Sequence, residues 1–293
     1  MRLFFIINSR NRSVNSDIVK LRLRFGNKHE YQLTEFAGHA IELANYAVQQ
    51  RFTHIIAVGG DGTLNEVVNG MLKCDAYEDV KPLFTFLPRG SGNDLARTLG
   101  YDTTINSLCK RIERNNIQMM DVGLAITAEC KRYFMNVMDL GLGGSVAEKV
   151  DAYRKDKWSF LAYQRAIWRI LPFYEKHTIS ITSSEHNFEG KALSVVIANG
   201  RWFGAGLGIA PEAHVNDGLL NLVIIGNVGI AEYLYYMPRI MMGKKINHAE
   251  VHYATVKGLT IRGNNLPCEM DGEAAGTAPV DISVIPGKIR LLS

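Results

Sequence analysis

Two glycine-rich segments in the first third of the chain have residue types and spacing that suit phosphate binding. They are residues 59–62 (GGDG) and 89–94 (RGSGND), and each follows an apolar run and precedes a helical pattern. Glycines let phosphate oxygens approach the main chain, and a helix N-terminus attracts anions through its unpaired N–H groups. Together the two segments predict a phosphate cradle.

Asp61 lies inside the first segment and indicates a cation. A carboxylate would repel phosphate unless a divalent cation lay between them, so we expect Asp61 to hold Mg²⁺ directly or through water. The alternative is a strand-to-helix turn in which Asp61 is only a local cap. Thr63 with Glu66, and Ser91 with Asp94, have capping-box spacing, which predicts that Thr63 and Ser91 open two helices.

A third group of polar residues lies near the C-terminus, where Glu269, Asp271 and Glu273 surround a glycine. Grouped acids can raise one another's pKa, which suits a general base, although the same pattern is typical of a solvated hairpin tip. Residues 216–218 (NDG) precede an apolar run and by themselves indicate a turn.

Short apolar runs alternate with helical patterns in the first third of the chain. The runs are residues 2–8, 54–60 and 82–88, with helical patterns near 37–50 and after Thr63. Continuous apolar strands separated by helices predict a parallel sheet that is covered on both faces. Both glycine segments would then meet at the carboxyl ends of the strands, where open α/β folds bind ligands.

From about residue 118 the pattern changes to many short strands, which predicts a mainly antiparallel β-sandwich. The predicted strands are residues 119–126, 132–140, 177–183, 192–200, 219–225, 258–263 and 281–286. Two helical stretches rich in aromatic residues, Leu, Ile and Met interrupt them, at residues 158–174 and 230–242. These stretches either pack in the core, line a pocket for an acceptor molecule or rest on a membrane.

We therefore expect an α/β fold of two domains. The first comprises residues 1–120, to which residues 286–293 return as a last strand, and the second comprises residues 121–285. No Pro-, Gly- or Ser-rich linker separates the two regions, so close joining is expected.

The composition is that of a globular protein, with 47% hydrophobic and 21% charged residues. No apolar run approaches the ~18 residues that span a bilayer, and residues 1–11 lack a signal-peptide pattern, so a cytoplasmic location is expected. The four cysteines include no CxxC pair and indicate neither a disulfide framework nor a zinc site.

The net charge is +4, but residues 1–30 hold seven Lys and Arg residues against Asp17 and Glu30. This basic bias indicates either a solvated face or attraction to phosphates or to an anionic membrane surface. Because no nucleic-acid-binding motif accompanies it, nucleic acid is not an expected partner.

The paired segments resemble a known family. GGDGTLNEVVNG (59–70) followed by LPRGSGNDLAR (87–97) is similar to the nucleotide-binding motifs of the diacylglycerol-kinase catalytic domain, a family that includes bacterial lipid kinases and sphingosine and ceramide kinases. NAD kinases share the GGDG element alone, and the second motif narrows the choice. The resemblance extends through the C-terminal half of the chain.

The resemblance implies which residues contact ATP. They are Asn8, Thr34, Gly59, Gly60, Asp61, Gly62, Thr63, Asn65, Glu66, Gly90, Ser91, Asn93 and Asp94. The chain departs from the family after Asn8, where residues 9–12 (SRNR) replace the usual proline and small glycine-containing turn. Arg10 or Arg12 would replace that loop's contribution by charge.

The resemblance also implies a structural Mg²⁺ site and a catalytic base. Residues 211–220 match the family segment P-x-A-x-x-x-D-G-x-L, which implies a carboxylate ligand from Asp217 and carbonyl ligands from His214 and Leu219. Glu273 is the implied base, with Asp271 as its neighbour or as a metal-linked partner.

The expected function is that of an ATP- and Mg²⁺-dependent lipid kinase with its active site in the cleft between two domains. An NAD-kinase-like phosphotransferase, and a nucleotide-binding sensor or scaffold without turnover, are the alternatives. The resemblance implies a lipid substrate and a role in phospholipid metabolism, and it allows peripheral contact with an anionic inner membrane surface. The particular lipid and the oligomeric state stay open, and a homodimer is allowed.

Overall fold

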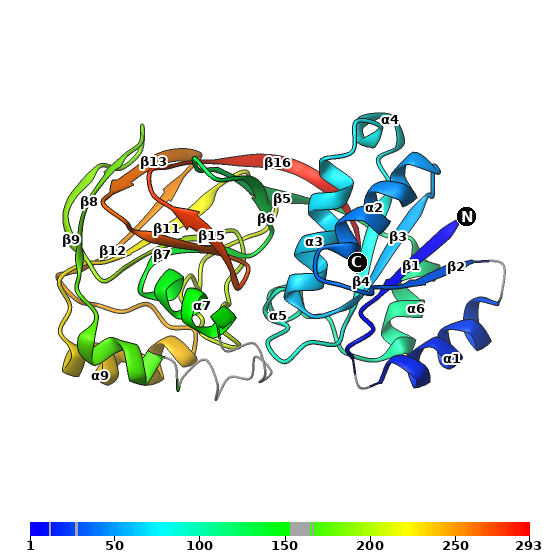
Figure 1. Ribbon diagram of the computed structural model, residues 1–293, viewed down its shortest axis with the longest axis horizontal. Coiled ribbons are helices and arrows are strands. Elements are labelled where there is room, and N and C mark those ends of the chain that lie inside the picture. The colour runs from blue at the N-terminus through cyan, green and yellow to red at the C-terminus, as the bar shows by residue number, and fades with distance from the viewer. Residues whose placement is uncertain (12, 27–28, 153–164, 166) are drawn as a thin grey trace. The chain divides into compact units, whose positions relative to one another are not determined.

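The computed structural model describes residues 1–11, 13–26, 29–152, 165 and 167–293 (Figure 1). The chain divides into two compact units. The first unit comprises Met1–Met120 with Gly287–Ser293, and the second comprises Asp121–Pro286.

A parallel sheet forms the centre of the first unit, in the order β2-β1-β3-β4-β16. Every residue of β1, β3 and β4 is buried, which is the pattern of parallel strands covered on both faces. The strands are β1 (Leu3–Ile7), β2 (Glu30–Leu33), β3 (His54–Gly59), β4 (Leu83–Pro88) and the end of β16 (Val280–Leu292).

Helices cover both faces of this sheet (Figure 1). On one face α1 and α6 bury Leu21 and Ile112 against Phe5, and on the other α2 packs beside α3 and places Tyr46 against Phe4. The helices are α1 (Val14–Phe25), α2 (His39–Gln49), α3 (Asp61–Leu72), α4 (Tyr77–Val80), α5 (Asp94–Leu99) and α6 (Ile105–Arg114).

The sequence analysis did not predict α1, β2 or α6. In α1 the helical period is present, because Val14, Ile18, Leu21 and Phe25 recur at i, i+4, i+7 and i+11 and pack in the core of the first unit, but it was overlooked beside the many basic residues of the segment.

The second unit is an antiparallel β-sandwich, as predicted. One sheet has the order β12-β11-β10-β7-β14-β15, and the other contains β16, β13, β8 and β9 with β5 and β6. Side chains of both sheets, such as Leu140, Ile197 and Ile261, form one core between them. The strands not yet defined are β5 (Ile117–Ile126), β6 (Lys131–Phe134), β7 (Val137–Gly141), β8 (His177–Thr182), β9 (Phe188–Ala192), β10 (Ser194–Ala198), β11 (Leu220–Ile225), β12 (Val251–Val256), β13 (Gly258–Gly263), β14 (Pro267–Met270) and β15 (Glu273–Thr277).

One predicted strand is wrong in this unit. Residues 132–140 were expected to form a single strand, but the structure breaks them into β6 and β7 at residues 135–136. The side chain of Asp271, in the turn between β14 and β15, accepts hydrogen bonds from the N–H groups at this break.

Helices cover the outer face of the six-stranded sheet. They are α7 (Leu142–Ala152), the helical residues 165 and 167–170, the short helix η1 (Leu171–Phe173) and α9 (Ile230–Met241). Their apolar side chains form a second cluster on this face, with Val196 and Val223 of the sheet. Of the predicted helical stretch 158–174, residues 158–164 and 166 lie outside the described residues.

The long strand β16 belongs to both units. Its first residues pair with β13 of the second unit, for example Ile282 with Leu259, and its last residues pair with β4 of the first unit, Arg290 with Leu83. The predicted strand 281–286 therefore does not stop at Pro286 but continues into the parallel sheet.

Candidate functional site

The two glycine segments touch backbone to backbone at the carboxyl ends of β3 and β4. A Cβ on Gly60 would lie 2.9 Å from the Cα of Gly90, and one on Gly90 would lie 2.6 Å from the Cα of Gly60. The Arg89 N–H donates to the Gly59 carbonyl at 2.7 Å, which ties the second loop to the first. Only glycine fits at Gly60 and Gly90, so the meeting point of the loops carries no side chains.

Neither helix begins where the capping-box spacing predicted: α3 begins before Thr63, and α5 begins after Ser91. The first helix begins at Asp61 with Gly60 as its N-cap, and the second begins at Asp94 with Asn93 as its N-cap, so Thr63 and Ser91 are not the caps. The spacing was misleading because the Thr63 hydroxyl accepts a hydrogen bond from Asn8. At α5, the N–H groups of the first turn are bonded by the Asp61 carboxylate.

Asp61 joins the two loops. Its carboxylate accepts the N–H groups of Asp94 and Leu95 at 3.2 and 3.3 Å, in the first turn of α5. The N-terminus of α3, by contrast, has no side-chain cap. Carboxylate oxygens are ligands that a hard cation prefers, so the position of Asp61 beside the glycine loops also suits such a cation.

Asn8, Thr34 and Thr63 fasten the ends of neighbouring elements at the same edge of the sheet. Asn8 Nδ2 donates to Thr63 Oγ1 at 2.9 Å, and the Ser9 N–H donates to Thr34 Oγ1 at 3.3 Å. The loop after β1 is thus held by side chains although it lacks a proline. Arg10 is exposed in this loop, and Arg12 lies outside the described residues.

Two residues expected to contact ATP face other parts of the first unit. The Glu66 carboxylate accepts the N–H groups of Gly38 and Ala40 at 3.0 and 3.3 Å, at the start of α2. The Asn65 side chain is fully buried and accepts from Asn69 Nδ2 at 3.1 Å. Glu66 therefore caps a helix, and Asn65 packs inside the unit.

Asn93 shapes the second glycine loop. Asn93 has a left-handed backbone, and its amide both accepts from the Gly90 N–H at 2.8 Å and donates to the Gly90 carbonyl at 2.9 Å. Ser91 is exposed between them at the tip of the loop.

An ion pair that sequence reasoning missed anchors this loop to α1. Arg89 Nε and Nη2 donate to the two oxygens of buried Asp17 at 2.6 and 2.9 Å. Burial acts to raise the pKa of Asp17, but hydrogen bonds from Arg89 and Ser13 and the charge of Arg89 outweigh it, so the pKa lies below 3.8. Seventy-two residues separate the partners, so no local pattern could have shown the pair.

The acidic turn of the second unit is a two-residue hairpin. Asp271 and Gly272 both have positive φ, 48° and 88°, and Met270 pairs with Glu273 across them. The Asp271 carboxylate accepts the N–H groups of residues 135–137 at 2.9–3.0 Å, which is the break between β6 and β7. Asp271 therefore holds the hairpin to this break.

Glu273 begins β15 and forms an ion pair with Arg132 of β6. The glutamate side chain remains about one-third exposed, at 34%. A carboxylate that is one-third exposed and paired with Arg132 can still reach a ligand, whereas the Asp271 carboxylate accepts hydrogen bonds from the main chain. Glu269, the third acid of the group, is buried in β14.

The predicted metal turn lies elsewhere in the second unit. Asp217 is exposed and accepts the Leu219 N–H at 3.0 Å, while Asp121 of β5 accepts the Gly218 N–H at 2.7 Å. Arg201 donates to the carbonyl that precedes His214, Ala213 O, at 3.0 Å. One carboxylate with backbone carbonyls suits a hard cation that keeps several waters, so the turn is compatible with Mg²⁺.

Within the described part of the chain no three His, Cys, Asp or Glu side chains gather to hold a metal. The two metal positions implied by the sequence do not need such a group, because each rests on a single carboxylate.

Asp139 is a buried acid that the sequence analysis did not select. It lies on the helix-covered face of β7, and Ser194 Oγ donates to its Oδ1 at 2.6 Å. Burial raises the pKa of Asp139 to about 7, although hydrogen bonds from Ser194 and the Gly143 N–H oppose the rise. The adjoining cavity, lined also by Ile167 and Ile240, has a volume of about 20 Å³, room for one water but not for an acyl chain.

Two protein-family models match this chain and together span most of its length. Residues 2–125 match the diacylglycerol kinase catalytic domain, and residues 136–293 match the YegS C-terminal NAD kinase beta sandwich-like domain. The chain belongs to the diacylglycerol-kinase-like family of lipid kinases. It is therefore an enzyme of the kinase class, as the motifs predicted.

Curated relatives of this lipid kinase carry the same family name. The chain is 28% identical to a diacylglycerol kinase of Staphylococcus saprophyticus over 84% of this chain and 78% of the relative. It is 27% identical to a diacylglycerol kinase of Bacillus subtilis over 84% of this chain and 79% of the relative.

Solved structures from Bacillus anthracis share the fold of this lipid kinase. One has a TM-score of 0.82 at 21% identity and covers 99% of this chain and 96% of its own. Another, described as a diacylglycerol kinase, has a TM-score of 0.74 at 20% identity with the same coverage. At such identities the likeness establishes the fold alone.

Proposed function

We propose that this lipid kinase transfers the γ-phosphoryl group of ATP to a hydroxyl group of a diacylglycerol-like lipid, in a reaction that depends on Mg²⁺. The observation that carries the ATP assignment is the backbone contact between Gly60 and Gly90. Two loops that meet at bare glycines, beside the N-terminus of the twelve-residue helix α3, which has no side-chain cap, would form a surface on which phosphate oxygens meet N–H groups.

The residues of the first unit would bind and orient the nucleotide. Residues 59–62 and the Gly90–Ser91 corner would contact the phosphates, and Asn8, Thr34 and Thr63 would hold the surrounding chain ends in place. Asp61 would hold Mg²⁺ at the loops. The bound metal would supply positive charge against the phosphate oxygens during transfer.

The residues of the second unit would act on the acceptor. Glu273 would accept the proton of the attacking hydroxyl group, with Arg132 orienting its carboxylate, and Asp271 would hold the hairpin that presents it. The turn at Asp217, with the carbonyls of His214 and Leu219, would hold a second, structural Mg²⁺.

The acceptor assignment rests on the relatives, which are named diacylglycerol kinases at 27–28% identity. No helix among the described residues combines the length and apolar composition needed to cross a bilayer. Because ATP is supplied inside the cell and the acceptor is a membrane lipid, we propose that the enzyme works at the inner membrane surface.

The test is a transfer assay with ATP labelled at the γ or the α position and a mixed lipid extract. We expect the γ label alone to appear in a lipid product, with diacylglycerol as the strongest acceptor among purified lipids, and EDTA to abolish the signal. Label appearing in NAD instead would establish the NAD-kinase-like alternative. Nucleotide binding without transfer to either acceptor would identify a sensor or scaffold.

A further inference from the structure

Large apolar side chains are exposed close together on the helical layer of the second unit. Trp168 is 58% exposed, Phe173 85%, Tyr235 78% and Met242 59%. Burying such side chains in water-free surroundings is favourable, and contiguous exposed apolar surface in a soluble protein usually contacts another molecule. We call these four side chains the apolar face.

The geometry of α9 separates its core-facing residues from its part of the apolar face. Tyr233 and Ile240 are seven residues apart and are buried against the sheet. Tyr235 and Met242 are also seven residues apart, but they are rotated by about 200° from the first pair because a helix turns about 100° per residue. They therefore lie on the side of the helix that faces away from the core.

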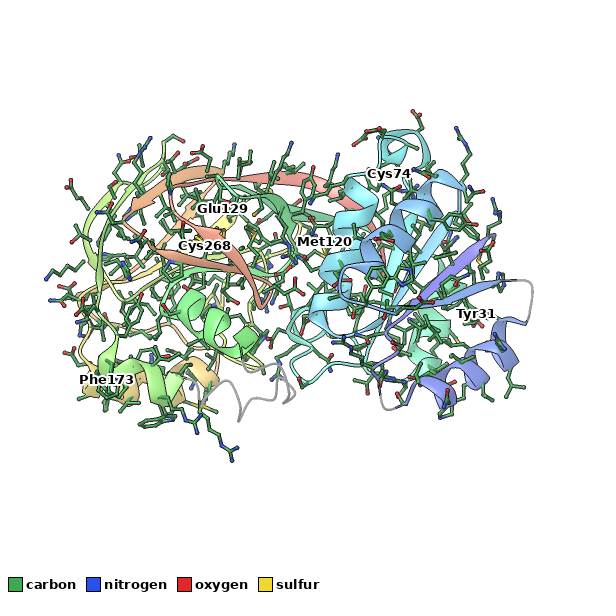
Figure 2. The ribbon with its side chains drawn as sticks, viewed as in Figure 1. Tyr31, Cys74, Met120, Glu129, Phe173 and Cys268 are labelled. Carbon is green, nitrogen blue, oxygen red and sulfur yellow. The ribbon has the colours of Figure 1, made fainter. Side chains whose placement is uncertain are left out.

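The other half of the apolar face lies on the neighbouring segment. Ile167, Ile170 and Leu171 share one buried cluster with α9, so this segment packs on the same face of the sheet. Figure 2 draws Phe173 at the edge of the second unit where Figure 1 draws α9. Trp168 and Phe173 are exposed, whereas Ile167, Ile170 and Leu171 of the same segment are buried, so the segment has an apolar buried side and an apolar exposed side.

The two segments that carry the apolar face are rich in basic residues. The described residues 165–176 and 229–248 contain six Lys and Arg residues against two acids, Glu175 and Glu232. The basic residues are Arg165, Arg169, Lys176, Arg239, Lys244 and Lys245. Lys245 is paired with Glu212 at 2.5 Å, and Arg165, Arg169 and Lys244 are exposed.

We infer that the apolar face docks on an anionic phospholipid bilayer. Aromatic and Met side chains insert at the level of the headgroups, and a basic fringe is attracted to anionic lipids. A second copy of the chain fits the charge less well, because a two-fold contact would bring the same six cations of both copies together. The inference rests on the proposed function in that the bilayer also holds the acceptor.

The test is sedimentation of the full chain with vesicles of phosphatidylcholine alone or mixed with phosphatidylglycerol. We expect binding to the mixed vesicles that weakens as salt rises. The variant Trp168→Ala/Phe173→Ala/Tyr235→Ala should bind at least about tenfold more weakly, because three interfacial anchors are gone. Arg169→Gln and Lys244→Gln should each weaken binding roughly fivefold at low salt.

The matched control is Val19→Ala/Leu23→Ala, which removes exposed apolar side chains from α1 in the first unit, 57% and 81% exposed. This control should bind vesicles as strongly as the wild type. All variants should have the melting temperature of the wild type, because the substituted side chains are exposed. Equal loss in the control would overturn the inference, as would a wild type that ignores anionic vesicles.

A wild-type dimer that the triple variant converts to monomer, with no vesicle binding, would overturn it in favour of a second copy. Turnover of a short-chain lipid dispersed in detergent should be equal in the triple variant and the wild type. That second readout separates the two proposals: vesicle binding without turnover contradicts the proposed function alone, and turnover without vesicle binding contradicts the docking surface alone.

Discussion

Glu273 and Asp271 flank one glycine, yet their surroundings differ. The Asp271 carboxylate is engaged by three main-chain N–H groups, and its own N–H donates to the Val137 carbonyl at 2.9 Å. Among the described residues, Glu273 forms an ion pair with one cation, Arg132, and it remains partly exposed. These contacts support a division in which Asp271 builds the hairpin and Glu273 acts as the base.

Glu273→Gln should reduce the rate of phosphoryl transfer by about 10²–10⁴, because glutamine keeps the size of the side chain but cannot accept a proton. ATP affinity should change little, since the glycine loops belong to the other unit. Steady-state rates and nucleotide titrations measure the two effects. Glu129→Gln is the control, because it removes an exposed acid that also contacts β15, through Thr277 at 3.4 Å, and its rate should be unchanged.

Asp271→Asn should lower stability and activity together. Its NH₂ group would face N–H donors that now meet a carboxylate, and the lost hydrogen bonds to a charged acceptor should cost about 2–4 kcal/mol in the free energy of unfolding. Urea denaturation measures that loss. Should Asp271→Asn unfold like the wild type yet lose turnover, while Glu273→Gln keeps it, the base is Asp271. Full activity in both variants would mean that the C-terminal acids are structural and that Asp61 is the candidate base, as in the NAD-kinase-like alternative.

Asp139 should make the second unit less stable as the pH rises. Its folded pKa, about 7, lies above the ordinary value of 3.8, so the native state disfavours ionisation. The contribution of neutral Asp139 to the free energy of unfolding is fully present below pH 3.8 and is lost as the pH rises to about 7. The loss is at most roughly 4 kcal/mol.

The variant Asp139→Asn tests this dependence, because asparagine is neutral at every pH. Its unfolding free energy relative to the wild type should rise between pH 4 and pH 7 and then stay level. Denaturation midpoints of both proteins across that range give the difference. A constant difference would mean that Asp139 titrates normally.

At the scale of elements, the two strand-to-helix loops, after β3 and after β4, hold each other in place. Gly59 O accepts from Arg89, Asp61 caps α5, and Arg89 reaches back to Asp17 in α1, so each loop is held by residues of another element. The proposed phosphate surface would therefore depend on the packing of β3, β4 and α1 and not on either loop alone.

Gly90→Ala should disrupt the contact between the two loops. The new Cβ would meet the Gly60 Cα at 2.6 Å, a backbone atom that can move only with its loop. We expect ATP affinity to fall at least about tenfold, measured by calorimetry. Gly190→Ala is the control, because its Cβ would meet only the end of the Phe188 ring, at 3.3 Å, in the second unit. Normal ATP affinity in Gly90→Ala would contradict the cradle.

At the scale of the whole molecule, the groups assigned to the reaction are divided between the units. The glycine loops belong to the first unit and the Glu273 hairpin to the second, while β16 carries the chain from one to the other. If these assignments hold, nucleotide binding and proton transfer rest on different units, so the two should respond independently to substitution.

Mg²⁺ should stabilise the protein through the turn at Asp217. A ligand that binds only the native state raises the unfolding midpoint by mass action. EDTA should therefore lower the melting temperature of the wild type by a few degrees and should have a smaller effect on Asp217→Ala. Thermal melts with and without Mg²⁺ make the comparison. An equal response in both proteins would place the stabilising ion elsewhere.

The amino-acid sequence alone determined the architecture and the family. Buried strands such as β3 and β4 are continuous apolar runs, and the paired glycine motifs that follow them resemble those of one family, so local pattern was sufficient. The same holds for Asp271 and Gly272, a dipeptide that favours the two-residue turn it forms.

Only the tertiary structure decided what the polar side chains bind. Thr63 and Glu66 have the spacing of a capping box, but Asn8 and the start of α2 offered them partners far along the chain. Asp17 and Arg89 meet across 72 residues for the same reason. Apolar burial follows a period that the sequence displays, whereas a hydrogen bond joins whichever groups folding brings within about 3 Å, and that proximity has no local signature.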